Sequence, residues 1–209
     1  LFHDDMADTN QPFSITDFAA RASAAGLRYL AEADYHEMSD SGLEDGARGR
    51  LAGRAGGDRL QREQYLDYLK GRRFRQTLLC HAETPMKEDA DPAMARGLHA
   101  VGHLRADPAE GGAVDLTEGV AVGFHSGDGA LLTTDHPVIK AALSMVGNAF
   151  PAALAFDDVL ASARQACASR APLEEDATVL AHAWTAAFGL GLVVLHVDPP
   201  GFAREAGTR

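Results

Sequence analysis

QREQYLDYLKGRRFRQTLLCHAE, residues 61–83, joins an amphipathic helix to an apolar strand with almost no loop between them. Leucine and tyrosine recur at the helical spacing up to Gly71, a residue suited to ending a helix. Asp58 is placed to cap the start of that helix. The apolar run Thr77–Cys80 predicts a strand. Between helix and strand lie three cations, Arg72, Arg73 and Arg75.

The residues before this stretch predict a second helix and a second strand. Ser14 or Thr16 can cap a helix that runs to about Ala25. The alternating segment Leu27–Ala31 then predicts a short strand. Residues 39–57 are rich in Gly, Ser, Asp and Arg, so we expect a mobile loop there, with a weak helical turn around residues 48–54.

A Pro-rich, charged segment over residues 84–93 predicts a boundary between two domains, 1–84 and 93–209. Beyond it we expect a strand over residues 98–104, a β-hairpin, three helices and a closing strand. The hairpin is expected at residues 120–125 and 130–134, the helices at about 135–150, 157–168 and 173–188, and the last strand at 192–197. This order is typical of a small winged-helix-like α+β domain.

Charge and hydropathy exclude several functional classes. The net charge of −11 argues against a general nucleic-acid binder and against docking on an anionic membrane. No apolar run is long enough to span a bilayer. Cys80 and Cys167 lie in apolar surroundings and are expected to be free thiols, so we expect a cytoplasmic protein.

The first 84 residues contain a set of short motifs: His3-Asp4, Asn10, Pro12-Phe13, Phe18, Gly26-Leu27, Tyr29-Leu30-Ala31-Glu32-Ala33, Glu63-Gln64-Tyr65, Asp67 and the run Arg73 to His81. Through these residues the segment closely resembles the predicted methyltransferase regulatory family. That family follows an S-adenosylmethionine-binding domain in certain bacterial methyltransferases, including protein-lysine methyltransferases of rickettsiae. The first residue is Leu rather than Met, so we expect a piece of a longer chain or a processed product.

The resemblance implies an accessory role without catalytic residues of its own. Residues 1–84 would supply the last helix and the edge strands that complete a Rossmann-like methyltransferase sheet, with Leu27–Ala31 and Arg75–Ala82 as an antiparallel pair. The implied partners are the N-terminal S-adenosylmethionine-binding domain in cis and a protein substrate. Residues 93–209 would be a winged-helix-like appendage for substrate or partner docking.

Glycine spacing predicts that the chain by itself holds no S-adenosylmethionine. The cofactor fold needs a glycine-rich turn between a strand and a helix. Gly53–Gly57 follows no predicted strand, and Gly189 and Gly191 come after a helix. We therefore expect no cofactor and no enzymatic activity in this chain alone, and S-adenosylmethionine in the preceding domain.

Two alternatives come from other classes of protein. His3, Asp4, His99 and His103 could serve a metal-dependent hydrolase. On a strand, however, His99 and His103 would share a face about 13 Å apart, too far for one ion. A winged-helix nucleic-acid-binding module is the second alternative. Its third helix would open with Glu174, Glu175 and Asp176, which repel phosphates.

The expected interaction residues are His3, Asp4, Arg72, Arg73, Arg75 and His81. The arginines form the one basic concentration on an acidic chain. They could contact acidic groups of the partner domain or of the substrate. The competing interpretation is a solvated helix end, where cations complement the helix dipole.

Overall fold

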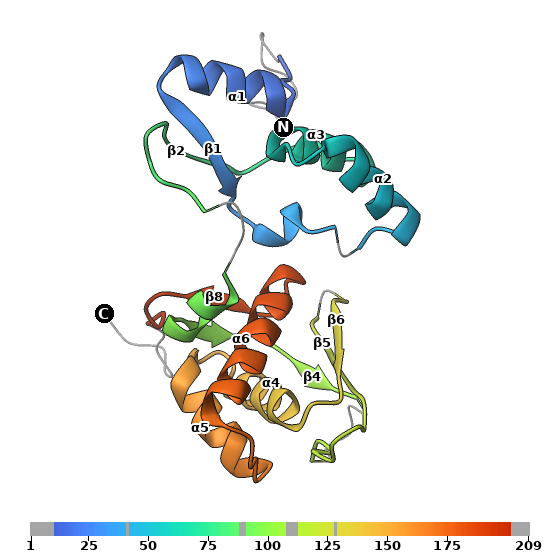
Figure 1. The fold of residues 1–209 in the computed structure, drawn as a ribbon, viewed down its shortest axis with the longest axis vertical. Helices are drawn as coiled ribbons and strands as arrows, with labels where there is room; N and C mark the ends of the chain where they lie inside the picture. Colours follow the sequence, from blue (N-terminus) through green and yellow to red (C-terminus); the bar gives the residue numbers. More distant parts are fainter. Residues whose placement is uncertain (1–10, 41, 88–90, 108–112, 128, 202–209) are drawn as a thin grey trace, which may run out of the picture. The chain divides into compact units, whose positions relative to one another are not determined.

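The computed structural model describes residues 11–40, 42–87, 91–107, 113–127 and 129–201. The chain divides into two compact units, unit 1 (Leu1–Met86) and unit 2 (Lys87–Arg209) (Figure 1). Each unit combines helices with small sheets, and the strand pairs are antiparallel. The prediction of a mixed fold with helices and antiparallel strands is confirmed. In the described part of the chain, no helix has the length and apolar character needed to cross a membrane.

Unit 1 is built from helices around one strand pair. Its described elements are α1 (Ile15–Ala24), β1 (Leu27–Glu32), the 3-10 helix η1 (Tyr35–Met38), α2 (Asp45–Ala55), α3 (Arg59–Lys70) and β2 (Thr77–His81).

Side-chain caps fix the ends of α1 and α3 as the sequence predicts. The Ser14 hydroxyl accepts a hydrogen bond from the Asp17 amide at 3.0 Å, and the Asp58 carboxylate accepts one from the Gln61 amide at 3.0 Å. Gly71 ends α3 in the left-handed conformation, with φ of +62°. A glycine is suited to this position because it lacks the Cβ that would clash there.

The predicted antiparallel pairing of the two N-terminal strands is confirmed. Leu27 lies opposite His81, Tyr29 opposite Leu79 and Glu32 opposite Thr77. The register shifts between Tyr29 and Ala31, so Leu30 forms a bulge.

The expected mobile loop over residues 39–57 is wrong in its middle part, where residues 45–55 form the helix α2. The weak helical turn expected around residues 48–54 lies inside this helix. Glycines at positions 46, 49 and 53 lower its intrinsic helix propensity. Leu51 and Ala55 are nevertheless buried, and α2 packs against α3. Tertiary packing therefore stabilises a helix that local composition disfavours.

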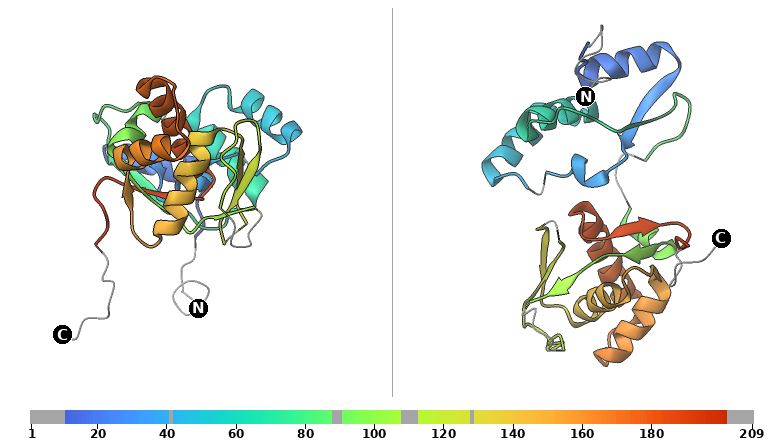
Figure 2. Two further views of the ribbon diagram at one scale, coloured as in Figure 1. Left: turned by 90° about the horizontal axis from the view of Figure 1, so that it is seen from below. Right: turned by 180° about the vertical axis from the view of Figure 1, so that it is seen from behind.

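Unit 2 contains two three-stranded sheets and three α-helices within its described residues. The sheets have the strand orders β7-β3-β8 and β4-β5-β6. The helices lie packed together beside the sheets (Figures 1 and 2). The described elements are η2 (Pro92–Gly97), β3 (His99–Val101), β4 (Arg105–Ala106), β5 (Val122–His125), β6 (Leu131–Thr134), α4 (Pro137–Ala149), β7 (Leu154–Ala155), α5 (Phe156–Ala166), α6 (Leu173–Gly189) and β8 (Val194–His196).

The single strand expected over residues 98–104 is wrong. The chain forms β3, leaves the strand at Gly102 and re-enters as β4 in the other sheet. A Cβ at Gly102 would lie 2.7 Å from the Leu192 carbonyl oxygen, so the backbones approach closely here. This close approach explains why a glycine occupies position 102. It also interrupts the strand that the alternation over residues 98–104 predicts.

Helix α6 buries most of its apolar surface inside the core of unit 2. Trp184 is fully buried and meets Phe156 edge to face, with ring centroids 5.1 Å apart. The same core contains Phe124 of the hairpin and residues of α4 and α5. The apolar residues of this helix therefore belong to the core of unit 2.

Candidate functional site

A buried cluster of opposite charges lies where α3 ends. We call it the acid–arginine network, and its members are Glu32, Glu63, Asp67, Arg72 and Arg75. Arg72 Nη1 lies 3.2 Å from Glu63 Oε2 and 3.1 Å from Asp67 Oδ1. Arg75 Nη2 lies 3.2 Å from the same Glu63 oxygen and 2.8 Å from Asp67 Oδ1. The other terminal nitrogen of Arg75, Nη1, pairs with Glu32. One carboxylate, Glu63, thus bridges both arginines.

Burial makes this network important for stability. The Glu63 side chain is 2% exposed and that of Arg72 is 6% exposed. Removing one partner from a buried ion pair typically costs about 3–5 kcal/mol, because an uncompensated charge remains inside the protein. All three carboxylates are already paired with arginine, so the network is suited to structural support.

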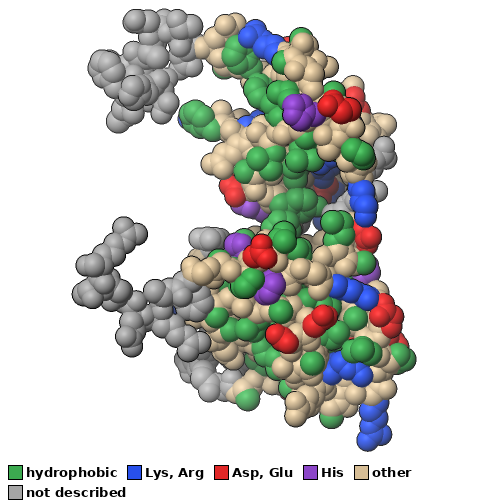
Figure 3. Space-filling view, turned by 90° about the vertical axis from the view of Figure 1, so that its left-hand side faces the viewer, with side chains coloured by type: hydrophobic (Ala, Val, Ile, Leu, Met, Phe, Trp, Pro, Cys, Tyr) green, Lys and Arg blue, Asp and Glu red, His purple; other side chains and the backbone are tan. Residues whose placement is uncertain are grey.

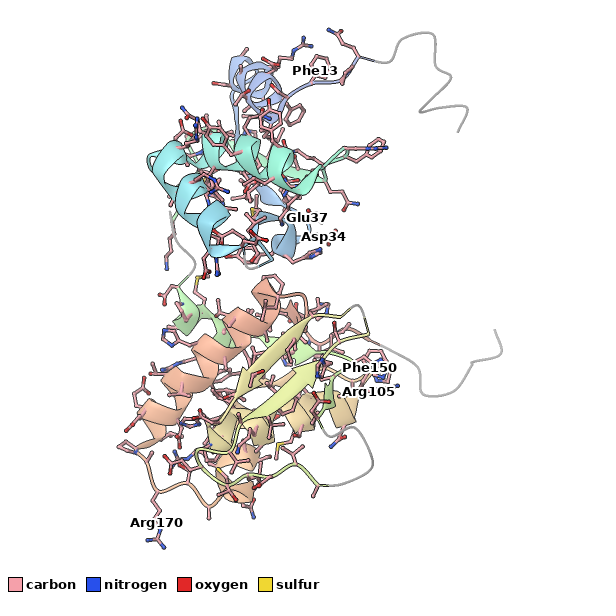
Figure 4. All side chains as sticks on the ribbon, turned by 90° about the vertical axis from the view of Figure 1, so that its right-hand side faces the viewer. Phe13, Asp34, Glu37, Arg105, Phe150 and Arg170 are labelled. Atoms are coloured by element: carbon pink, nitrogen blue, oxygen red, sulfur yellow. The ribbon has the colours of Figure 1, made fainter. Side chains whose placement is uncertain are left out.

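Arg72 of the network and two neighbouring cations, Lys70 and Arg62, also fix the segment that follows β1. Arg72 Nε lies 3.2 Å from the Glu37 carboxylate, and Lys70 Nζ donates a hydrogen bond of 2.7 Å to the Glu37 carbonyl oxygen. Arg62 donates to the Met38 carbonyl oxygen at 2.8 Å. Figure 4 shows Glu37 on η1 close to Asp34. Burial lowers the pKa of Lys70 below its ordinary value.

Tyr29 extends the network into the strand pair. Its hydroxyl donates a hydrogen bond of 3.1 Å to Glu32. Burial, followed by the negative charges of Glu63 and Glu32, raises the pKa of Tyr29 well above its ordinary value. Burial by itself would lower the pKa of Arg75, but the hydrogen bond to Asp67 and the charge of Glu32 raise it overall. Both shifts reflect the same enclosed, negatively charged environment.

The structure separates the arginines that the sequence groups together. Arg72 and Arg75 point into the network, whereas Arg73 is exposed and forms no ion pair with any residue that the structure describes. His81 is exposed at the end of β2. His3 and Asp4 lie outside the described residues. The interpretation as a solvated helix end therefore fits Arg73, but it does not fit Arg72 or Arg75.

Sequence reasoning assigns no role to the acidic partners, Glu32, Glu63 and Asp67. One signal was available: Glu63 and Asp67 are four residues apart on α3, on the side that buries Leu66. Two acidic residues on the buried side of a helix need cationic partners, and these must come from other parts of the fold.

One face of the strand pair carries exposed apolar side chains. We call it the open face and define it by Arg28, Ala31, Leu78 and Cys80, which alternate with the buried residues Tyr29 and Glu32 and the half-buried Leu79. Leu78 is 44% exposed, and Leu30 in the adjoining bulge is 36% exposed. Figure 3 views unit 1 from the side on which β2 lies in Figure 1, and it shows hydrophobic side chains gathered there.

The outer edge of β2 presents backbone groups that do not bond to β1. The Ala82 amide donates a hydrogen bond to the Gly26 carbonyl oxygen, and the Ala33 amide donates one to the Gln76 carbonyl oxygen. These two bonds determine which residues of β2 direct their amides toward β1. In an antiparallel pair, hydrogen-bonded positions alternate along each strand. Cys80 and Leu78 therefore bond to β1, while Thr77, Leu79 and His81 direct their amides outward. Among the residues that the structure describes, β2 has a strand neighbour on one side only.

The histidines of unit 2 do not form the arrangement that the sequence suggests. His99 lies in β3 opposite His196 of β8, whereas His103 lies beyond the strand and stacks on Phe150 at a centroid distance of 5.0 Å. The expectation that His99 and His103 share one strand is therefore wrong. Within the described ranges, no group of three or more His, Cys, Asp or Glu could hold a metal ion.

Comparison with known proteins confirms the resemblance of the N-terminal region. Residues 1–81 match the family described as "Predicted methyltransferase regulatory domain". An uncharacterized protein of Rickettsia prowazekii (strain Madrid E) is 35% identical over 81 residues, which are 39% of this chain and 14% of that protein.

The fold resembles two solved structures over most of the chain. PKMT2 from Rickettsia typhi in complex with AdoHcy has a TM-score of 0.74 and 21% identity, covering 93% of this chain and 37% of that one. A second structure of PKMT2 from Rickettsia typhi has a TM-score of 0.73 and 21% identity, covering 93% and 38%. The chain thus spans well under half the length of the proteins it resembles.

Proposed function

We propose that this chain is a non-catalytic accessory region of a larger S-adenosylmethionine-dependent methyltransferase. The observation that carries the proposal is the match of residues 1–81 to the predicted methyltransferase regulatory domain. The fold likeness to PKMT2, one structure of which contains AdoHcy, supports the same class. In this proposal the cofactor and the reacting groups belong to a domain that precedes this chain.

Unit 1 is proposed to dock on that domain through the strand pair. The outer edge of β2 offers outward amides at Thr77, Leu79 and His81, and a neighbouring strand could pair with them. The open face beside this edge exposes Leu78, which packing against a partner would bury. The acid–arginine network supports the proposal because it holds α3, η1 and both strands in one arrangement.

Unit 2 is proposed to be a winged-helix-like appendage that docks a protein substrate or partner in the cytoplasm. Residues 87–209 contain 8 Lys and Arg and 16 Asp and Glu, a net charge of −8. Such a surface favours basic protein segments over nucleic acid. No observation favours a metal-dependent hydrolase or a nucleic-acid-binding module.

Calorimetry with S-adenosylmethionine tests the accessory assignment. We expect no micromolar binding to this chain. The same titration should show binding when the preceding domain is present. Micromolar affinity of the isolated chain would contradict the proposal.

A proline placed at the free edge tests the docking mode. His81→Pro removes an amide that points away from β1, so unit 1 should stay folded, since proline is tolerated on edge strands. Methyl transfer by the longer protein should fall. Cys80→Pro is the comparison, because it removes an amide that bonds to β1 and should unfold the strand pair. Unchanged turnover with His81→Pro would count against pairing at this edge.

A further inference from the structure

Unit 2 contains a largely apolar cavity of about 560 Å³ that has no place in the proposed function. Its floor includes Leu104, Phe124 and Ala141, which are buried. Its mouth includes Arg105 and Asn148, which are exposed. Small-molecule sites in proteins are typically apolar cavities of about 300–1,000 Å³ with a few polar groups.

The walls of this cavity are held in place by specific contacts. Lys140 of α4 is fully buried, and its Nζ donates hydrogen bonds to the carbonyl oxygens of Thr117 at 2.6 Å and Val120 at 2.9 Å. These bonds anchor the loop whose residues Val114 and Leu116 line one side. The cavity is therefore bounded by a fixed loop as well as by α4 and the strands.

Arg105 is the one formally charged residue among those that line the cavity. Its guanidinium forms no ion pair with any described residue, and the nearby Asp107 is already engaged by His125. Figure 4 labels Arg105 toward one margin of unit 2 and Arg170 at the far end. A cation at the mouth of an apolar cavity complements a ligand with an apolar body and an anionic head.

We propose that this cavity binds a small amphiphilic carboxylate. The apolar chain occupies the space between Phe124, Ala141 and Leu116. The carboxylate accepts hydrogen bonds from Arg105 and Asn148 at the mouth. This inference concerns unit 2 alone and does not depend on the role proposed for unit 1.

Titration calorimetry with hexanoate, octanoate and decanoate tests the proposal on the whole chain. We expect one site per chain and an affinity that rises roughly three- to fourfold with each added methylene, as burial of apolar surface requires. Decanol is the matched uncharged probe. Absence of decanoate binding at millimolar concentration, or binding of many molecules per chain, would overturn the proposal.

Three variants locate the site. Arg105→Gln should weaken decanoate binding roughly two- to fivefold, the range for an exposed ion pair, and leave decanol binding unchanged. Arg170→Gln removes another exposed arginine of unit 2 and should change neither. Ser144→Leu places a larger side chain in the cavity and should weaken both ligands. If Ser144→Leu does not fold, the binding of decanoate and of decanol to Arg105→Gln still tests whether Arg105 holds the carboxylate. An equal loss of decanoate affinity with Arg170→Gln, or no loss with Arg105→Gln, would contradict the assignment of the site to this cavity.

Discussion

Oε2 of Glu63 lies 3.2 Å from Arg72 Nη1 and an equal 3.2 Å from Arg75 Nη2, inside unit 1. Both arginines come from the segment after α3, and Arg75 also reaches Glu32 of β1. A single buried carboxylate therefore links the helix, the connecting segment and, through Arg75, the strand pair. This linkage makes Glu63 the position where unit 1 should be most sensitive to loss of charge.

Glu63→Gln should lower the free energy of unfolding of unit 1 by about 3 kcal/mol, because both arginines lose a buried anionic partner. All four tyrosines lie in the first 86 residues and the one tryptophan, Trp184, lies in unit 2. Tyrosine and tryptophan signals during urea unfolding therefore report the two units separately.

Arg73→Gln is the matched control for this substitution. It removes an exposed arginine from the same segment and should change stability by less than about 0.5 kcal/mol. Equal effects of the two substitutions would show that the network adds nothing to stability.

Alkaline pH should destabilise unit 1 through Tyr29. Its pKa is raised in the folded state, so below the ordinary tyrosine value of about 10 it is neutral in both states. Above that value the unfolded chain loses the proton while the folded chain keeps it, and stability falls as pH rises. Urea unfolding at about pH 9 and about pH 11 should show a smaller loss in Tyr29→Phe than in the original protein. Tyr68→Phe, at an exposed tyrosine, should behave like the original.

A glycine in α2 is predicted to be replaceable with a gain in stability. Gly49 lies inside the helix, and a Cβ built there meets no atom within 4 Å. Gly49→Ala should therefore stabilise unit 1 by about 1 kcal/mol. Gly56→Ala should destabilise it by about 1–2 kcal/mol, because Gly56 has a φ of +54°. Thermal unfolding measures both, and destabilisation by Gly49→Ala would contradict the assignment of α2.

Local patterns predict the elements of this chain where the apolar periodicity is clear. The β1–β2 pair and the three helices of unit 2 are of this kind. In unit 1 the side-chain caps at Ser14 and Asp58 agree with the periodicity of α1 and α3. The sequence predicts only a weak helical turn where α2 forms, because the glycines of α2 hide a stabilisation that comes from packing on α3. The strand break at Gly102 depends on the backbone of Leu192, which is far away in sequence.

The acid–arginine network is the part that sequence reasoning misses most clearly. Glu32 and Arg75 are 43 residues apart and meet only because β1 and β2 pair. A run of arginines after a helix resembles a solvated helix end as long as the positions of the acidic residues in the fold are unknown. The sequence leaves open whether these arginines contact a partner or lie at a solvated helix end, and it does not predict that Arg72 and Arg75 pair with acidic residues inside unit 1.

The most direct test of the account is the affinity of this chain for the separately purified S-adenosylmethionine-binding domain that the proposal places before it. Leu78→Lys puts a charge on the open face and should weaken that association at least about tenfold, since burying a leucine is worth about 1.5–3 kcal/mol. Leu131→Lys alters a similarly exposed strand leucine in unit 2, 49% exposed against 44%, and should leave the affinity unchanged. No measurable association, or equal weakening by the two substitutions, would contradict docking through the strand pair.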